Sequence, residues 1–213
     1  MIKAIIFDMD GVLIDSEIIY LNHMYEKLKH VYPHIKREAL FSVVGSDTKR
    51  TMKIISNVIG EDVDSDSFIK LYEGLWVNCR PDYPAILRRE VPALLKELHS
   101  RGYLLALASS TSRKGIEEVL TSCGLKDGFD YVVSGEEFKE SKPNPEIYRH
   151  TAAVLECKPQ ECLVVEDSTY GIMAGHNAGM TVAALIDDRF GTDQSLANYF
   201  MHNLEEVLKI ISI

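Results

Sequence analysis

A repeating alternation of short apolar runs and helix-like stretches limits the fold of this chain more than any other feature of its sequence. Helical patterns at residues 92–100, 112–122, 145–155, 168–178 and 204–211 alternate with strand-like runs at 104–108, 131–133, 162–165 and 181–185. Strands that alternate with helices of this length predict βαβ units and a parallel sheet. The apolar run at residues 2–7, interrupted only by Lys3, predicts one more buried strand in the same sheet.

Residues 17 to about 80 differ, because helical periodicity continues there without a convincing strand. One apolar face at helical spacing consists of Phe68, Leu71, Tyr72, Leu75, Trp76 and Cys79. Pro81 and Pro84 then end the helical region and stiffen the segment that leads back to the sheet. We therefore predict a Rossmann-like, doubly wound α/β core of residues 1–15 and 83–213. An all-helical domain of residues 16–82 is inserted after the first strand.

Acidic residues follow two of the predicted strands. Asp8 and Asp10 come after the first strand, where alternate side chains point to one side, and Glu166 and Asp167 follow the run at 162–165. Right-handed crossovers bring the carboxyl ends of parallel strands to one edge, so these carboxylates are expected to gather there. Two charges about 4 Å apart repel by roughly 4 kcal/mol at an effective dielectric constant of 20, so the cluster calls for a cation. Oxygen ligands without histidine or cysteine favour Mg²⁺.

Ser109 and Lys142 are expected at the same edge. Ser109 follows the run at 104–108 and offers a hydroxyl, while the backbone N–H groups of Ser110 and Thr111 open a helix and form an anion site. Lys142 lies on a loop whose backbone is stiffened by Pro143. Carboxylates, a hard cation, a hydroxyl with backbone amides and a fixed lysine together predict a phosphoryl-transfer site.

Composition narrows the classes of partner. The 213 residues carry a net charge of −9 without a basic stripe, which argues against nucleic acid. No window approaches eighteen consecutive apolar residues, so no membrane-spanning helix is expected, and the N-terminus leads into the first strand without a signal peptide. The cysteines form no C-x-x-C pair and are expected to be reduced thiols. These features favour a cytoplasmic protein with a small-molecule partner, and they do not indicate an oligomeric state.

Four segments, taken together, resemble the motifs of the haloacid dehalogenase superfamily. They are DMDGVLIDSE at residues 8–17, the strand that ends in Ser109, SKPNPEIY at residues 141–148 and VVEDSTYGIMAG at residues 164–175. They occur in the family's order, and the resemblance covers essentially the whole chain outside the insert. The insert itself is similar to that of the β-phosphoglucomutase-like and small-phosphatase subgroup.

This resemblance implies catalytic roles that the residue chemistry supports. Asp8 would be the nucleophile that forms an aspartyl phosphate. Asp10 would protonate the leaving alcohol and then activate the hydrolytic water. Ser109 and Lys142 would hold the phosphoryl oxygens, and Ser110 would contribute its backbone N–H.

The resemblance also implies a magnesium site. Asp8, the backbone carbonyl of Asp10 and Asp167 would hold the ion, with Glu166 binding it directly or standing behind these ligands. This set agrees with the preference for a hard cation that the carboxylate cluster indicates by itself.

Two reactions remain open after an aspartyl phosphate forms. The sugar-phosphate mutases of the subgroup carry a histidine soon after the first motif and an arginine soon after the insert's glycine. Here Tyr20 stands near the first position, with His23 the nearest histidine, and the basic residues after Gly45 are shifted to Lys49 and Arg50. The sequence therefore favours a phosphatase of a small phosphorylated metabolite, such as a sugar phosphate, over a β-phosphoglucomutase-type mutase.

The insert is expected to close over the site as a cap that excludes bulk water. The loop from Gly45 to Thr48 is a predicted substrate loop, with Lys49 or Arg50 as a second contact for an anion. A helix start with a solvated Lys-Arg pair is the alternative interpretation of this stretch.

A phospho-accepting signalling domain, or a non-catalytic binding protein, is the alternative from a different class. Receiver domains also combine clustered aspartates, a hydroxyl and a lysine around Mg²⁺. They do not need a second aspartate two residues after the acceptor, and they are nearer 120 residues in length. Asp10 and the insert of about sixty residues therefore favour an enzyme.

Overall fold

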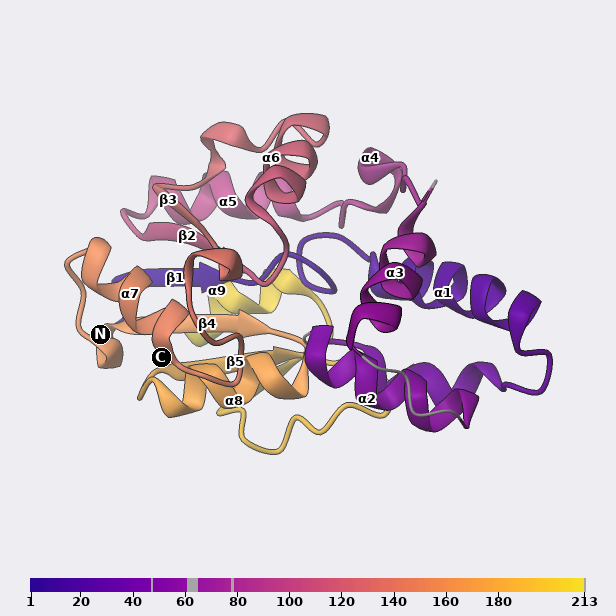
Figure 1. Ribbon diagram of the computed structural model, residues 1–213. Helices are drawn as coiled ribbons and strands as arrows, with labels where there is room; N and C mark the ends of the chain where they lie inside the picture. The colour runs from indigo at the N-terminus through magenta and orange to yellow at the C-terminus, as the bar shows by residue number, and fades with distance from the viewer. Residues whose placement is uncertain (47, 61–64, 78, 213) are drawn as a thin grey trace.

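The computed structural model describes residues 1–46, 48–60, 65–77 and 79–212, and its centre is a parallel sheet (Figure 1). The strands occur in the order β3-β2-β1-β4-β5-β6. They span Ala4–Phe7 (β1), Leu104–Ser109 (β2), Tyr131–Ser134 (β3), Cys162–Glu166 (β4), Thr181–Leu185 (β5) and Tyr199–Met201 (β6). β1 pairs with β2 on one side and with β4 on the other, so Phe7 lies opposite both Leu107 and Val165. The predicted doubly wound α/β fold is confirmed.

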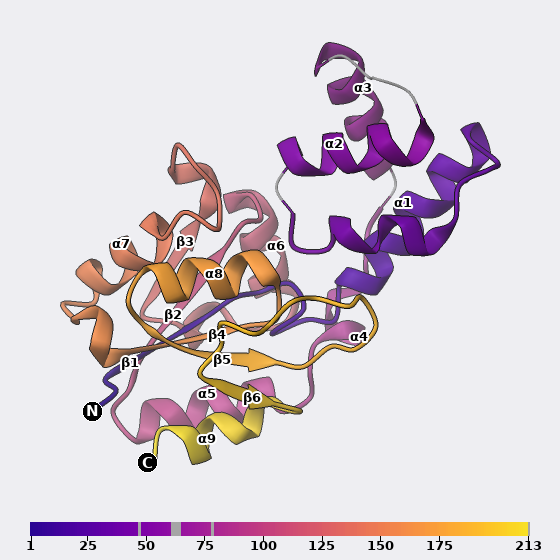
Figure 2. The ribbon, with the colours of Figure 1, turned by 90° about the horizontal axis from the view of Figure 1, so that it is seen from below.

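Helices cover both faces of the sheet, which is why β1 is apolar throughout and fully buried. Ile5 and Phe7 belong to the apolar cluster beneath α5 (Val91–Ser100), α6 (Arg113–Ser122) and α9 (Val207–Ile210). Ala4 and Ile6 belong to the cluster beneath α7 (Glu146–Val154) and α8 (Thr169–Asn177). Figure 2 shows α5 and α9 on one side of the sheet and α8 on the other.

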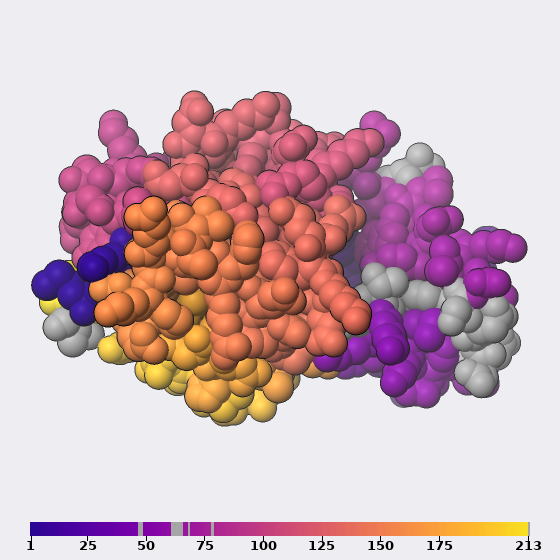
Figure 3. All heavy atoms as spheres, turned by 60° about the vertical axis from the view of Figure 1, so that its left-hand side comes forward, coloured from indigo at the N-terminus to yellow at the C-terminus, as the bar shows by residue number. Residues whose placement is uncertain are grey.

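The helical insert, residues 17–76, forms a separate lobe beyond the carboxyl ends of the strands (Figures 1 and 3). It contains α1 (Glu17–Val31), the 3-10 helix η1 (Arg37–Val43), α2 (Thr48–Ile59) and α3 (Ser65–Trp76). Buried residues from these elements, among them Leu28, Leu40 and Ile55, form an apolar cluster of the insert's own. The short helix α4 (Tyr83–Ile86) then leads the chain back to the core.

A loop of the core completes this apolar cluster. Phe190, which follows β5, is 7% exposed and packs into the cluster with its ring centroid 5.8 Å from that of Phe41. The neighbouring Arg189 forms an ion pair with Asp15, just before α1, with 2.6 Å between Nη2 and Oδ1. The insert is therefore fastened to the core by a segment far from it in sequence.

Two features near the C-terminus differ from the prediction. β6 is missing from the predicted strands, because its apolar run is only three residues long and lies between the polar residues Asn198 and His202. The predicted helix over 204–211 is instead the 3-10 turn η5 (Leu204–Glu206) followed by the single turn of α9. Leu204 and Val207 are both buried, and their spacing of three residues suits a 3-10 turn. Within the described residues, no helix is both long and apolar enough to cross a membrane.

Candidate active site

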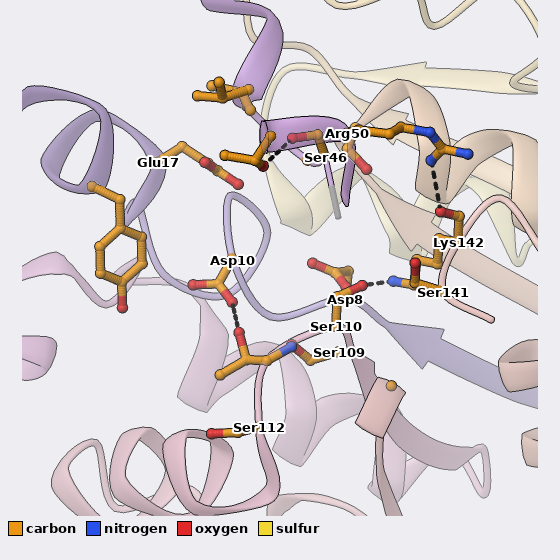
Figure 4. Close-up of a pocket in the computed structure, with 18 of the residues that line it drawn as sticks. Asp8, Asp10, Glu17, Ser46, Arg50, Ser109, Ser110, Ser112, Ser141 and Lys142 are labelled. Atoms are coloured by element: carbon orange, nitrogen blue, oxygen red, sulfur yellow. Dashed lines mark hydrogen bonds and ion pairs between the residues drawn. The ribbon is translucent and has the colours of Figure 1, made fainter. Parts of the chain in front are cut away.

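The strand order reverses between β1 and β4, and the predicted site residues lie at this point. Asp8 directly follows β1, Ser109 ends β2 and Glu166 ends β4, while Lys142 comes from the segment between β3 and α7. In doubly wound sheets, ligands bind in the crevice outside the carboxyl ends of the strands at such a switch point. The close-up in Figure 4 shows Asp8, Asp10, Ser109, Ser110 and Lys142 gathered around one space.

The ammonium group of Lys142 joins three of these strand ends. Its Nζ donates to Asp8 Oδ1 at 2.6 Å, to Glu166 Oε1 at 2.7 Å and to the carbonyl oxygen of Ala108 at 3.0 Å. Lys142 is only 6% exposed. Burial alone would lower the pKa of Lys142, but the carboxylates of Asp8 and Glu166 raise it well above its ordinary value. The lysine is therefore a fixed positive charge beside Asp8.

Asp8, Glu166 and Asp167 form a carboxylate group that can share one cation. One oxygen from each lies within 4.8 Å of the others. Asp167 is 3% exposed, and no described residue donates a hydrogen bond to its carboxylate. The turn after Asp10 approaches it closely, since a Cβ on Gly11 would lie 2.0 Å from Asp167 Oδ2. Hard oxygen donors and a buried carboxylate that lacks a donor fit a Mg²⁺ ion.

Burial and neighbouring carboxylates raise the pKa of Asp8, Asp167 and Glu17 and so disfavour the ionisation of these three groups. Burial raises the pKa of Asp8 to about 7, with Lys142 opposing the rise and Glu166 adding to it. Burial and the charge of Glu166 raise the pKa of Asp167 well above its usual range. Burial and the charge of Asp10 raise the pKa of Glu17, which faces the same space, to about 8. Because a bound divalent cation favours the ionised carboxylates, protons and cation compete for this site.

Two hydroxyl groups hold the side chain of Asp10. Ser16 Oγ donates to Asp10 Oδ1 at 2.6 Å, and Thr111 Oγ1 donates to Asp10 Oδ2 at 2.7 Å. Ser16 stands at the N-cap position of α1 but makes no capping bond there, because its hydroxyl is engaged by Asp10. The Asp10 carboxylate is outside the group that can share a cation. The predicted metal contact through the Asp10 carbonyl stays a prediction.

Glu166 has partners that the sequence analysis did not identify. Tyr148 Oη donates to Glu166 Oε1 at 2.8 Å, and Ser168 Oγ donates to Glu166 Oε2 at 3.0 Å. Tyr148 is fully buried, and its ring centroid lies 5.0 Å from Lys142 Nζ. A signal was available, because a tyrosine on the buried face of a helix needs a partner for its hydroxyl. Gly171 leaves room for this network, since a Cβ there would lie 1.7 Å from Glu166 Oε1.

Ser109 and Ser110 border the space beside Asp8. Ser109 is 1% exposed, and its Oγ accepts a hydrogen bond from the backbone N–H of Thr111 at 3.0 Å. Because its oxygen already accepts this bond, the hydroxyl proton is available to an anionic ligand. Ser110 lines the same space and is exposed. The loop after β2 therefore places the Ser109 hydroxyl and Ser110 next to Asp8, whereas the backbone N–H of Thr111, predicted to be part of the anion site, is bonded to Ser109. Phosphate binding by Ser109 and Ser110 stays a prediction.

A cavity of about 1310 Å³ lies between these strand ends and the helical insert. Its insert side carries an aromatic group, defined here as Tyr20, Tyr72 and Trp76. The rings of Tyr20 and Tyr72 meet Trp76 edge-on, with centroids 5.7 Å and 5.6 Å away. The cavity is large enough for a small metabolite, and it is polar on the core side and aromatic on the insert side.

The predicted substrate loop of the insert reaches the core. A Cβ on Gly45 would lie 2.5 Å from Ser168 Cβ, so glycine permits the close approach of the two lobes. Arg50 Nη1 donates to the carbonyl oxygen of Lys142 at 3.1 Å, and its guanidinium lies over the ring of Tyr170 at 4.2 Å from the centroid. Gly45 and Arg50 both line the cavity, whereas the side chain of Thr48 lies outside the described residues. Substrate contact by these three residues stays a prediction.

Comparisons with known proteins agree with this geometry. A sequence model of the family described as Haloacid dehalogenase-like hydrolase matches residues 5–185. YhcW of Bacillus subtilis (strain 168), whose name assigns it provisionally as a phosphatase, is 29% identical over 99% of this chain and 94% of its own. The pyrophosphatase PpaX of Bacillus cereus (strain B4264) is 26% identical over 99% of this chain and 97% of its own. The crystal structure of β-phosphoglucomutase from Clostridium difficile shares the fold, with a TM-score of 0.84 and 22% identity over 100% of this chain and 96% of that one.

Proposed function

Because the chain belongs to the haloacid dehalogenase-like hydrolase family, we propose that it is a Mg²⁺-dependent phosphatase that acts through an aspartyl phosphate. Its substrate is a small phosphorylated metabolite, such as a sugar phosphate. The observation that carries the proposal is the contact of Lys142 Nζ with Asp8 Oδ1, beside Asp10 held by two hydroxyls. Relatives named as phosphatase and pyrophosphatase support the same class of reaction.

Two displacements at phosphorus make up the proposed reaction. In the first, a carboxylate oxygen of Asp8 attacks, the bond from phosphorus to the ester oxygen breaks, and Asp10 gives a proton to the leaving alcohol. In the second, water attacks the aspartyl phosphate while Asp10 takes its proton, and the bond between phosphorus and Asp8 breaks. Lys142 and Ser109 hold the phosphoryl oxygens through both steps. Phosphate leaves, and both aspartates return to their starting states.

Asp8, Asp167 and the backbone carbonyl of Asp10 would hold the Mg²⁺ ion, with Glu166 beside them. When bound, the ion supplies positive charge to the phosphoryl oxygens. Glu166 is already bonded to Lys142, Tyr148 and Ser168, so it also anchors the lysine in place.

The helical insert acts as a cap in this proposal. It covers the strand ends and limits the access of bulk water to the aspartyl phosphate. The bond from Arg50 to the Lys142 carbonyl oxygen supports a closed arrangement of the two lobes.

Phosphate release from a panel of phosphorylated metabolites tests this proposal. We expect release that needs Mg²⁺ and stops when EDTA is added. Isomerisation of β-glucose 1-phosphate should be followed in parallel, because conversion to glucose 6-phosphate without phosphate release would show a mutase instead. Mg²⁺-dependent phosphorylation of Asp8 without turnover on any substrate would show a phospho-accepting signalling domain.

A further inference from the structure

Glu17 presents to the cavity a carboxylate that has no partner among the described residues. It is the first residue of α1, and the preceding Ser16 is bonded to Asp10, which fixes the start of the helix beside that residue. Glu17 lines the cavity, and Figure 4 shows its carboxylate directed toward the space above Asp10 and beside Ser46. No described residue donates a hydrogen bond to this carboxylate or forms an ion pair with it. A partly buried acceptor that no group of the described residues satisfies is suited to a donor on a ligand.

The position of Glu17 identifies which part of the ligand it meets. This step rests on the proposed function, in which Asp10 gives its proton to the leaving alcohol. That alcohol must therefore lie on the Asp10 side of Asp8, which is also the Glu17 side (Figure 4). The transferred phosphoryl group lies toward Ser109 and Lys142. Glu17 thus faces the leaving alcohol.

The positively charged residues that line the cavity lie away from Glu17. Among the described residues that line it, the lysines and arginines are Lys49, Arg50, Lys139 and Lys142. They belong to two short segments that meet where Arg50 Nη1 donates to the Lys142 carbonyl oxygen. The side occupied by Asp10, Glu17 and Tyr20 has acidic and aromatic groups instead. An anionic leaving group placed there would meet like charge without a compensating cation.

We infer that Glu17 selects the leaving group: it accepts a hydrogen bond from a hydroxyl of a neutral, polyhydroxylated alcohol and discriminates against leaving groups that are anionic at this position. Burial and the charge of Asp10 raise the pKa of Glu17 to about 8, and the positive charge of a bound Mg²⁺ opposes that rise, so the ionised form of Glu17 is the acceptor in the Mg²⁺-loaded protein. Either oxygen of the carboxylate can then accept such a bond, and a hydrogen bond to a charged acceptor is stronger than one between neutral groups. A phosphate or carboxylate group has no proton to offer Glu17 when ionised. The chain is therefore assigned to neutral sugar or polyol monophosphates and not to pyrophosphate.

The aromatic group on the insert fits the same class of alcohol. Tyr20 follows Glu17 by three residues on α1, so both side chains lie on the same side of the helix. The ring of Tyr20 packs against Trp76, which packs against Tyr72. Aromatic rings offer apolar surface to the carbon framework of a sugar, and they carry no positive charge that would balance a second phosphate.

Matched pairs of substrates test this assignment in the full-length protein with Mg²⁺. Glycerol 3-phosphate is compared with 3-phosphoglycerate, and sorbitol 6-phosphate with 6-phosphogluconate, because in each pair a neutral CH₂OH group of the leaving alcohol is replaced by a carboxylate. Pyrophosphate completes the set. For at least one pair, we expect kcat/KM of the neutral member to exceed that of its anionic partner and of pyrophosphate by about tenfold or more. Equal values, or a preference for the anionic substrates, would overturn the inference.

Variants of Glu17 assign that preference to one side chain. Glu17→Gln keeps the shape and removes the charge, so the ratio of neutral to anionic kcat/KM should fall about tenfold, mainly through KM. Glu17→Asp keeps the charge but shortens its reach, so KM for the neutral substrate should rise while pyrophosphate stays a poor substrate. Glu26→Gln makes the same chemical change at an exposed position of α1 and should retain the wild-type ratio. A ratio that Glu17→Gln leaves unaltered would refute the role of Glu17.

Failure of the inference is distinguishable from failure of the proposed function. p-Nitrophenyl phosphate serves as a general probe of phosphatase activity. If the wild-type protein releases phosphate from this probe but shows no preference within the pairs, only the inference is overturned. If it releases phosphate from neither this probe nor any substrate of the set, the proposed function is overturned together with the inference.

Discussion

The core wall and the insert wall of the cavity hold their side chains in different ways. In the core, Lys142 and Glu166 are 6% and 0% exposed and are bonded to groups from several strand ends and helices. On the insert, Tyr20 and Trp76 are partly exposed and are held by edge-on ring contacts, and Glu17 has no described partner. Removal of one member of a buried ionic network lowers stability strongly, because its partners are left buried and unpaired. Ring packing tolerates the replacement of one aromatic side chain by another. In the proposed reaction, the residues that carry the chemistry are thus held in the core, and residues of the insert can change the choice of substrate without disturbing them.

Replacement of the proposed nucleophile, Asp8, should reduce activity more than any change on the insert wall. Asp8→Asn removes the attacking oxygen but keeps the shape of the side chain, so kcat should fall by about 10⁴-fold or more. Phosphate release under saturating Mg²⁺ measures the loss, and a thermal melt checks that the protein is folded. Retained Mg²⁺-dependent turnover would refute the assignment of Asp8.

The second aspartate separates formation of the phosphoenzyme from its breakdown. Asp10→Asn should lengthen the lifetime of the phosphorylated protein by about 10²- to 10⁴-fold, because water then attacks without a general base. Rapid-quench labelling with a ³²P-labelled substrate measures that lifetime. The double variant Asp8→Asn with Asp10→Asn is the control and should take up no label. Equal lifetimes in Asp10→Asn and wild type would contradict the role of Asp10.

The pH dependence of Mg²⁺ binding reports on the crowded carboxylates of the core wall. The pKa of Asp8 is raised to about 7, so protons compete with the cation below that pH and Mg²⁺ affinity should be about tenfold weaker at pH 6 than at pH 8. Titration calorimetry at the two pH values measures the change. Because the pKa of Asp8 is higher in the folded protein than in the unfolded chain, protonation of Asp8 stabilises the folded protein at low pH. Its contribution is lost as the pH rises from about 4 to 7, and added Mg²⁺ should oppose that loss.

The smallest effect is expected on the insert wall. Trp76→Phe shortens one aromatic side chain of the cavity and should raise KM about threefold, with a smaller change in kcat, because the ring contributes to substrate binding more than to the reacting atoms. Steady-state kinetics on the preferred neutral substrate checks this prediction. A loss in kcat as large as that of a core variant would remove the distinction between the two walls.

The sequence predicts the strand ends well, and the structure shows why. Asp8, Ser109 and Glu166 each end or follow a parallel strand, and parallel strands bring these positions to one edge whatever lies between them. The contacts of Ser16 and Thr111 with Asp10 could not be predicted in this way. These contacts depend on the orientation of the loop that carries Thr111 and of the helix start that carries Ser16. The spacing of residues in the sequence does not reveal that orientation.

The insert is harder to predict than the core for a related reason. Its helical periodicity identifies which residues are apolar, but it does not say which face meets the cavity and which meets the insert's own cluster. Trp76 belongs to the predicted apolar face, yet it lines the cavity as well as packing against the cluster. Glu17 is a plausible first-turn residue by sequence alone, and only its position opposite Asp10 gives it a further meaning.

Phe190 sets a condition on how the chain is assembled during synthesis. The first strand cannot complete its pairing until its neighbours have been synthesised, since Ala4 pairs with Leu104 and with Cys162. The apolar cluster of the insert is completed later still, because it includes Phe190 from beyond the fifth strand. A nascent chain that ends before residue 190 therefore contains neither a finished sheet nor a finished insert. Both lobes are completed only when the last quarter of the polypeptide has left the ribosome, so neither is expected to fold as an independent fragment.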